Sequence, residues 1–205
     1  MKDTAYFLAA VPEPVRCLGR RLKPFSVGHQ IILQRFESAF VCGATPTFED
    51  LIFGIAICSR SYPGALRFLD SPLSSIWLRW WGFKIWIAVL GGLNLAKSGA
   101  VFAAYVQSGS TYPCVKFKES KNIHEIRVPL VATVKTFLIR CGHSEAEALA
   151  KPYGLALWEY SIANACEGRN EIVGEEWQRE YREFSITPQE EIDRWLAAAR
   201  RGANN

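Results

Sequence analysis

Few side chains in this 205-residue chain have the types and spacing that catalysis or metal binding needs. The three histidines are His29, His124 and His143, and none lies at the spacing of a metal ligand from a cysteine or a carboxylate on a shared helix face. Cys141 and His143 are two positions apart, so a helix would point them to different sides. We therefore expect no zinc site.

Carboxylates and glycine motifs, which carry chemistry in many enzymes, have structural explanations here. Glu145 and Glu147 stand in what reads as the first turn of a helix, where the helix dipole favours acidic side chains without any catalytic role. Gly54 and the pair Gly91-Gly92 complete neither a dinucleotide-binding pattern nor a phosphate-binding loop, and the chain has no G-x-S-x-G. These observations predict that the protein is not an enzyme and has no catalytic residues, cofactor or metal.

The cysteines are spread along the chain without a C-x-x-C pair; they are Cys17, Cys42, Cys58, Cys114, Cys141 and Cys166. Three of them are expected on apolar faces of helices, where a free cysteine behaves as a small hydrophobic residue. An even number would permit disulfides, but a chain of this size does not need them. Because the start of the chain carries no secretory signal, we expect a cytoplasmic protein.

The clearest signals for secondary structure lie between Val128 and Val173. Apolar residues recur at three- and four-residue steps from Pro129 to Cys141, and Gly142 supplies a stop. Ser144 and Glu147 form the sequence pattern of a capping box, and Pro152 separates this short helix from one that runs to Gly168. This region predicts packed helices.

Further helices are expected along the rest of the chain. One begins after Ser26, one follows Thr45-Pro46-Thr47 with Thr at the cap and Pro in the first turn, and a short one covers Tyr62–Leu69. The apolar stretch Leu73–Val106 predicts two helices with a break at Gly91-Gly92 or Gly99.

The fold class expected from these elements is all-α: an irregular multi-helix bundle with a Pro-rich N-terminal arm and a central loop. The organisation predicted is an irregular basic arm over 1–25, a helical domain over 26–173 with a loop at about 107–127, and a charged helical extension over 174–205.

Tryptophan side chains are the candidate partner-binding residues, and they are Trp77, Trp80, Trp81, Trp86 and Trp158. The first four lie within ten positions, so their cluster is either the centre of a core or a buried contact with a partner. Trp158 is expected to be buried in a core helix with Leu155 and Ile162 on the same face.

Charge is unevenly distributed along the chain. Residues 1–135 hold 16 Lys and Arg against 8 Asp and Glu (+8), whereas residues 136–205 hold 8 against 12 (−4). This asymmetry is compatible with intramolecular docking, with head-to-tail association between subunits, or with ordinary solvated faces. The basic run from Arg16 to Lys23 has no interleaved aromatic residues, so it is read as a solvated arm rather than as a phosphate-binding one, and nucleic-acid binding is not expected.

The segment Ile85–Val106 is long enough to cross a bilayer, with Lys97 as its only charge. A lysine near the centre of such a span costs about 3 kcal/mol, and glycines and Asn94 lie near it. We therefore expect buried helices here and no membrane span.

Two blocks resemble small helical proteins encoded in the tail-gene regions of long-tailed bacteriophages, and the nearest functional family is the tail assembly chaperone. The first block is Leu22-Lys23-Pro24-Phe25-Ser26-Val27-Gly28-His29 leading to Phe53–Arg60. The second is Ser144-Glu145-Ala146-Glu147-Ala148-Leu149 followed by Pro152-Tyr153-Gly154-Leu155-Ala156-Leu157-Trp158-Glu159-Tyr160 and Glu167-Gly168. Counted over their full spans, 22–60 and 144–168, the two blocks cover about a third of the chain.

The resemblance implies a mostly helical, non-enzymatic protein of the host cytoplasm that binds the tape measure protein of the phage tail, keeps its hydrophobic helices soluble, and is displaced as the tail tube polymerises. Apolar helices of the partner would lie against exposed apolar and aromatic surface, with self-association adding avidity. Because Trp77–Trp86 is strongly apolar, two alternatives stay open: a structural virion or head-tail component, and a membrane-associated interaction protein.

Overall fold

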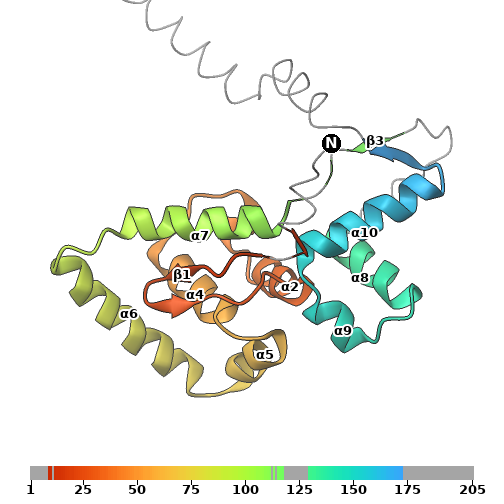
Figure 1. Cartoon of the computed structure of the whole chain (residues 1–205). Coiled ribbons are helices and arrows are strands. Elements are labelled where there is room, and N and C mark those ends of the chain that lie inside the picture. The colour runs from red at the N-terminus through yellow and green to blue at the C-terminus, as the bar shows by residue number, and fades with distance from the viewer. Residues whose placement is uncertain (1–8, 11, 112, 114, 118–128, 173–205) are drawn as a thin grey trace, which may run out of the picture.

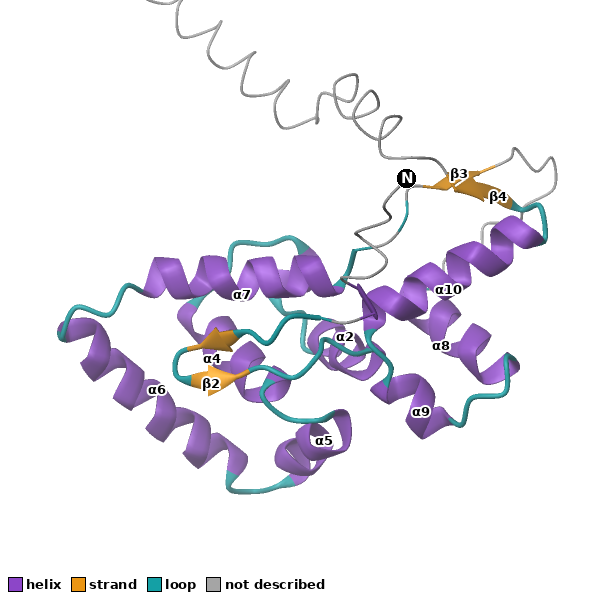
Figure 2. Cartoon of the chain, viewed as in Figure 1, coloured by secondary structure: helices purple, strands orange, loops and turns teal. Residues whose placement is uncertain are grey.

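A computed structural model describes residues 9–10, 12–111, 113, 115–117 and 129–172. The fold is all-α, as expected, with two small two-stranded sheets among the described residues (Figure 1; Figure 2). The helices are α2 Val27–Arg35, α3 Ala39–Cys42, α4 Phe48–Cys58, α5 Tyr62–Asp70, α6 Ser74–Leu90, α7 Leu95–Gly109, α8 Leu130–Arg140, α9 Glu145–Ala150 and α10 Tyr153–Cys166. The strands are β1 Arg16–Cys17, β2 Arg20–Arg21, β3 Val115–Phe117 and β4 Asn170–Ile172.

Helix starts follow local capping chemistry. Capping boxes open α2, α4 and α9, in which Ser26, Thr47 and Ser144 each accept a hydrogen bond from the backbone N–H three residues later. The expected start of α4 is corrected in one respect: Thr47 is the cap, so Pro46 precedes the helix and does not lie in its first turn. These caps satisfy backbone N–H groups that would otherwise lack a partner at the starts of the three helices.

Helix α4 lies at the centre of the larger half of the molecule. It packs against α2, α5, α6 and α7, and its side chains from Leu51 to Cys58 are buried except for the half-buried Phe53. Gly54 allows this packing, because a Cβ atom there would lie 2.7 Å from the ring of the fully buried Phe102 of α7. The core therefore depends on a close approach between α4 and α7.

Helices α8, α9 and α10 form the smaller half, beside α2 in Figure 1. Two backbone hydrogen bonds join the halves: Tyr153 N–H donates to the Phe25 carbonyl (2.7 Å) and Val27 N–H donates to the Lys151 carbonyl (3.0 Å). One hydrophobic core contains buried side chains of both halves, and a second, smaller cluster of Ile32, Ile57 and Ala65 lies within the larger half. The described residues therefore pack as one unit.

The N-terminal arm expected over residues 1–25 is corrected for residues 15–25. Here β1 and β2 form an antiparallel hairpin, and Cys17, Leu22 and Phe25 are buried in the common core. Lys23 N–H also donates to the Cys58 carbonyl at 2.8 Å. Burial of these apolar side chains outweighs the effect of the prolines, so this segment belongs to the helical domain.

The loop expected at about 107–127 is also corrected in part. Helix α7 continues to Gly109, and β3 pairs antiparallel with β4 in the register Val115↔Ile172. Residues 118–128 of that loop and the extension expected over 174–205 lie outside the described residues.

The apolar stretch Leu73–Val106 folds as two helices, as expected, with the break at Gly91-Gly92 and with Gly99 inside α7. Gly92 has φ +97°, a conformation that suits glycine at the end of a helix. Within the described residues, no helix has the length and apolar character needed to cross a membrane.

Candidate partner-binding surface

The side chains that could bind a metal or act as nucleophiles show no arrangement for either role in the described part of the chain. No cluster of three or more His, Cys, Asp or Glu side chains suited to a metal ion occurs there. Burial raises the pKa of the Cys17 thiol to about 11 and that of the Cys58 thiol to about 12, so both stay protonated at neutral pH. Cys42, Cys141 and Cys166 are exposed, which corrects the expectation that Cys141 and Cys166 lie on apolar helix faces.

A cavity of about 380 Å³ lies between the N-terminal segment, the end of α7 and the start of α10. Among the described residues that line it, Glu13 alone carries a charge, and the Tyr105 hydroxyl there donates to the Lys23 carbonyl (2.7 Å). The cavity therefore offers few groups that could recognise a polar ligand.

The five candidate tryptophans separate into two classes. Trp81 and Trp158 are buried, at 8% and 9% exposure, and Trp77 is half-buried. Trp80 and Trp86 are exposed at 58% and 54%. Trp158 is therefore buried, as expected for a core helix, whereas Ile162, which was expected to be buried with it, is 41% exposed. Only Trp80 and Trp86 offer most of an indole ring to a partner.

An apolar stripe runs along the outer side of α6 and its N-terminal cap. Its members are exposed and follow one another at alternating three- and four-residue steps; they are Leu73, Ile76, Trp80, Phe83, Ile87 and Leu90. We call this set the α6 stripe. It contains six of the twelve exposed large hydrophobic side chains of the described residues, and Trp86 beside it is a seventh.

The spacing of the α6 stripe is that of a helix–helix interface. Alternating three- and four-residue steps place side chains along one seam, as at the a and d positions of a coiled coil. The opposite side of α6 carries the buried Trp81 and Ile85, which pack into the core, so the stripe is a second apolar face on the same helix. Monomeric proteins seldom leave a contiguous apolar surface of this kind uncovered.

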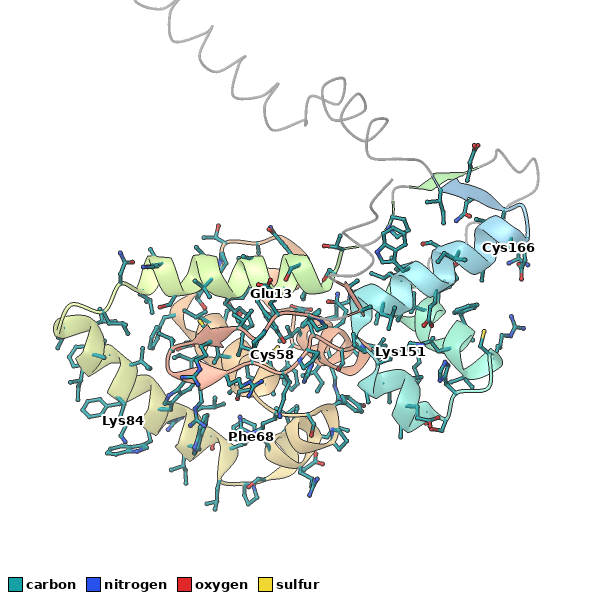
Figure 3. The ribbon with its side chains drawn as sticks, viewed as in Figure 1. Glu13, Cys58, Phe68, Lys84, Lys151 and Cys166 are labelled. Atoms are coloured by element: carbon teal, nitrogen blue, oxygen red, sulfur yellow. The ribbon has the colours of Figure 1, made fainter. Side chains whose placement is uncertain are left out.

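Two arginines, Arg20 and Arg60, lie along one edge of the α6 stripe. Both contact Trp77, the residue that follows the stripe residue Ile76. The Cζ atom of Arg60 lies 4.8 Å from the centre of the Trp77 ring and 4.0 Å from that of Phe68. The Cζ atom of Arg20 lies 5.1 Å from the Trp77 ring and 5.5 Å from the Trp81 ring. Figure 3 shows Phe68 between α5 and α6. These are cation–π contacts, and they place two positive charges beside one indole.

Local structure holds both arginines in position. Arg20 follows a tight hairpin turn in which Leu18 and Gly19 both have positive φ, 45° and 74°, as in the turns that match the twist of a hairpin. The guanidinium of Arg60 donates to the Ala56 carbonyl at the end of α4. Partial burial and the nearby Arg20 lower the pKa of Arg60, because both disfavour its charged form.

His29 anchors the backbone of Arg60. Its Nε2 is 2.9 Å from the Arg60 carbonyl oxygen, which can only accept, and its Nδ1 is 3.2 Å from the Ser26 backbone N–H, which can only donate. The ring is therefore neutral, with the proton on Nε2. Burial lowers the pKa of His29, because it disfavours the charged form of the ring.

Two further cations lie beside the stripe on α6 itself. Lys84 stands next to Phe83, with its Nζ atom 5.3 Å from the Trp80 ring, and Figure 3 shows it on the outer side of α6. Arg79 is exposed and stands on the other edge of the stripe, next to Trp80. Helix α6 contains no acidic residue, so both edges of the stripe carry positive charge alone.

Comparisons with known proteins add no assignment: no protein-family model, curated protein or solved structure matches the chain.

Proposed function

We propose that this protein is a non-enzymatic binding protein that covers an apolar helix of a partner with the α6 stripe. The observation that carries the proposal is the six-residue stripe itself, exposed and spaced as a helix–helix seam. Leaving such a surface in water costs free energy, and burying it against a second apolar helix recovers that cost for both proteins. The mode of recognition is therefore the packing of an amphipathic helix against an exposed apolar helix face.

The specific form of this function that we propose is that of a phage tail assembly chaperone, which shields hydrophobic helices of a tape measure protein in the host cytoplasm. This form rests on the resemblance of the two sequence blocks given above. The α6 stripe is consistent with it, since a chaperone of this kind needs an accessible apolar surface of its own.

A chaperone of this kind should be encoded beside a very long helical protein, and the test is co-expression with that protein. Wild-type protein should raise the soluble fraction of that partner. The double variant Ile76→Ser/Phe83→Ser should lose the effect, because both side chains belong to the stripe. Phe36→Ser is the matched control, since Phe36 is 50% exposed and Phe83 is 51% exposed, but Phe36 lies outside α6.

Purified phage particles separate the chaperone from its alternatives. A chaperone should be missing from mature particles, whereas stoichiometric amounts there would identify a structural virion component. If the double variant solubilised the partner as well as wild type does, the α6 stripe would not be the binding surface.

A further inference from the structure

We infer that the partner helix carries acidic side chains along the edges of its apolar face, and that Arg20, Arg60, Arg79 and Lys84 receive them. The inference rests on the proposed function and names the chemical class of the partner: an amphipathic helix with Leu- or Ile-type residues in a seam and Asp or Glu at the flanking positions.

The first observation is that these cations have no acidic partner in the described structure. The ion pairs found there join Lys135 to Glu145, Lys151 to Glu159 and Arg169 to Glu167. All three lie in the smaller half of the molecule or just after α10. In the described residues 9–109, ten Lys and Arg stand against five Asp and Glu, and none of them forms an ion pair.

The second observation is the placement of the cations relative to the α6 stripe. On one edge, Arg20 and Arg60 lie against Trp77, one position from Ile76, and Lys84 follows Phe83. On the other edge lies Arg79. In paired helices, the residues that flank the apolar seam select the partner by charge. Two positive edges select a partner with negative ones.

Arg20 and Arg60 are better placed for this role than flexible surface cations. Stacking on Trp77 and Phe68 restricts their side chains, so less conformational entropy is lost when each binds a carboxylate. Their guanidinium groups are also partly shielded from water, which strengthens an ion pair relative to one on an open surface. A bound carboxylate would also relieve the repulsion between these two charges.

Charge also argues against a second copy of α6 as the occupant. If two α6 stripes paired antiparallel about their midpoint, Trp80 of one would lie against Phe83 of the other. The two-fold axis would bring each edge of one stripe against the same edge of the other, so Arg79 would lie near Arg79 of the second copy and Lys84 near its Lys84. Like charges would therefore meet on both edges. Self-association, which the sequence led us to expect, therefore needs another surface and stays a prediction.

The experiment uses the full-length protein and three labelled helical peptides of about three heptads with the same Leu and Ile seam. Their flanking positions carry Glu, Gln or Lys, and binding is measured by fluorescence anisotropy. We expect the Glu peptide to bind about tenfold more tightly than the Gln peptide at low salt, the Lys peptide to bind most weakly, and added salt to remove the difference.

Two charge variants locate the effect. Arg20→Gln/Arg60→Gln and, separately, Arg79→Gln/Lys84→Gln should each reduce the preference for Glu over Gln while leaving the affinity for the Gln peptide unchanged. Arg79 and Lys84 are exposed, so the second variant keeps the test valid if the first fails to fold. Arg67→Gln, an exposed arginine on α5, is the control and should retain the full preference.

The outcomes distinguish this inference from the function on which it rests. Equal binding of the three peptides would overturn the inference and leave the helix-binding function standing. Failure of every peptide to bind would overturn both. Binding to vesicles that contain anionic lipid, without binding to any peptide, would also overturn both and would favour the membrane-associated alternative.

Discussion

At the scale of single residues, His29 links helix capping to the arginines beside the α6 stripe. It is buried and neutral, and it joins Ser26 at the start of α2 to the carbonyl of Arg60. Protonation would place a second N–H on Nδ1, where it would face the Ser26 backbone N–H. The native state therefore holds the neutral ring, and its pKa is lowered.

We predict that this histidine makes stability fall in mild acid. Because the folded pKa is below the unfolded value of about 6.5, the unfolded state binds the extra proton first, and stability that is full above about pH 6.5 is lost as the pH falls below it. Chemical unfolding at pH 7 and at pH 5.5 measures the loss. His29→Asn should be less stable at pH 7 but should lose less between the two pH values. An unchanged pH dependence in His29→Asn would contradict this assignment.

Replacement of two tryptophans by alanine should affect the free energy of unfolding to very different extents. Trp158→Ala should lower the free energy of unfolding by ~3–5 kcal/mol, because it empties a buried site. Trp80→Ala should change it little, since that ring is 58% exposed. Urea unfolding followed by circular dichroism measures both. A stable Trp158→Ala protein would show that the ring is not part of the core.

The sequence could identify which residue types matter but not which tryptophan faces the solvent. Apolar side chains occupy every side of α6, so periodicity alone does not single out one buried face. The three- and four-residue steps of the α6 stripe are visible in the sequence and could have been found. The contacts of Arg20 and Arg60 with Trp77 could not, because they join residues that are far apart in the chain.

At the scale of secondary structure, local signals predicted most of the helices. The capping box at Ser144, the threonine cap before α4, the stop at Gly142 and the break at Gly91-Gly92 all depend on interactions within a few residues, which sequence patterns record directly. The β1–β2 hairpin and the β3–β4 pair were missed. Their strands are two or three residues long, and β3 finds its partner more than fifty residues away.

Two glycines inside helices provide a matched test of packing. Gly54→Ala should be destabilising, because the gain in helix propensity of up to ~1 kcal/mol is smaller than the ~1–3 kcal/mol cost of forcing a methyl group against buried Phe102. Gly99→Ala should stabilise by ~0.5–1 kcal/mol, since nothing lies within 4 Å of the added Cβ atom. Thermal unfolding of the two variants measures both effects. Stabilisation by Gly54→Ala would show that α4 and α7 do not pack as closely as described.

At the scale of the whole molecule, a packed interior and an uncovered apolar helix face occur together. One core includes residues from Cys17 to Leu157, and α6 contributes Trp81 and Ile85 to it while presenting the α6 stripe to solvent. Positive charges line both edges of that stripe, and the ion pairs of the described residues lie elsewhere. Such a distribution is typical of a binding surface rather than of a surface that only keeps a protein soluble.

The claim that the α6 stripe contacts a partner helix is tested most directly by site-specific photo-crosslinking during co-expression. A photoreactive phenylalanine analogue is placed at Phe83 and, in a separate protein, at Phe36, two sites of nearly equal exposure on different surfaces. The account predicts that position 83 crosslinks to apolar helices of the long partner protein and that position 36 does not. Equal crosslinking from both positions, or crosslinking from position 36 alone, would contradict it.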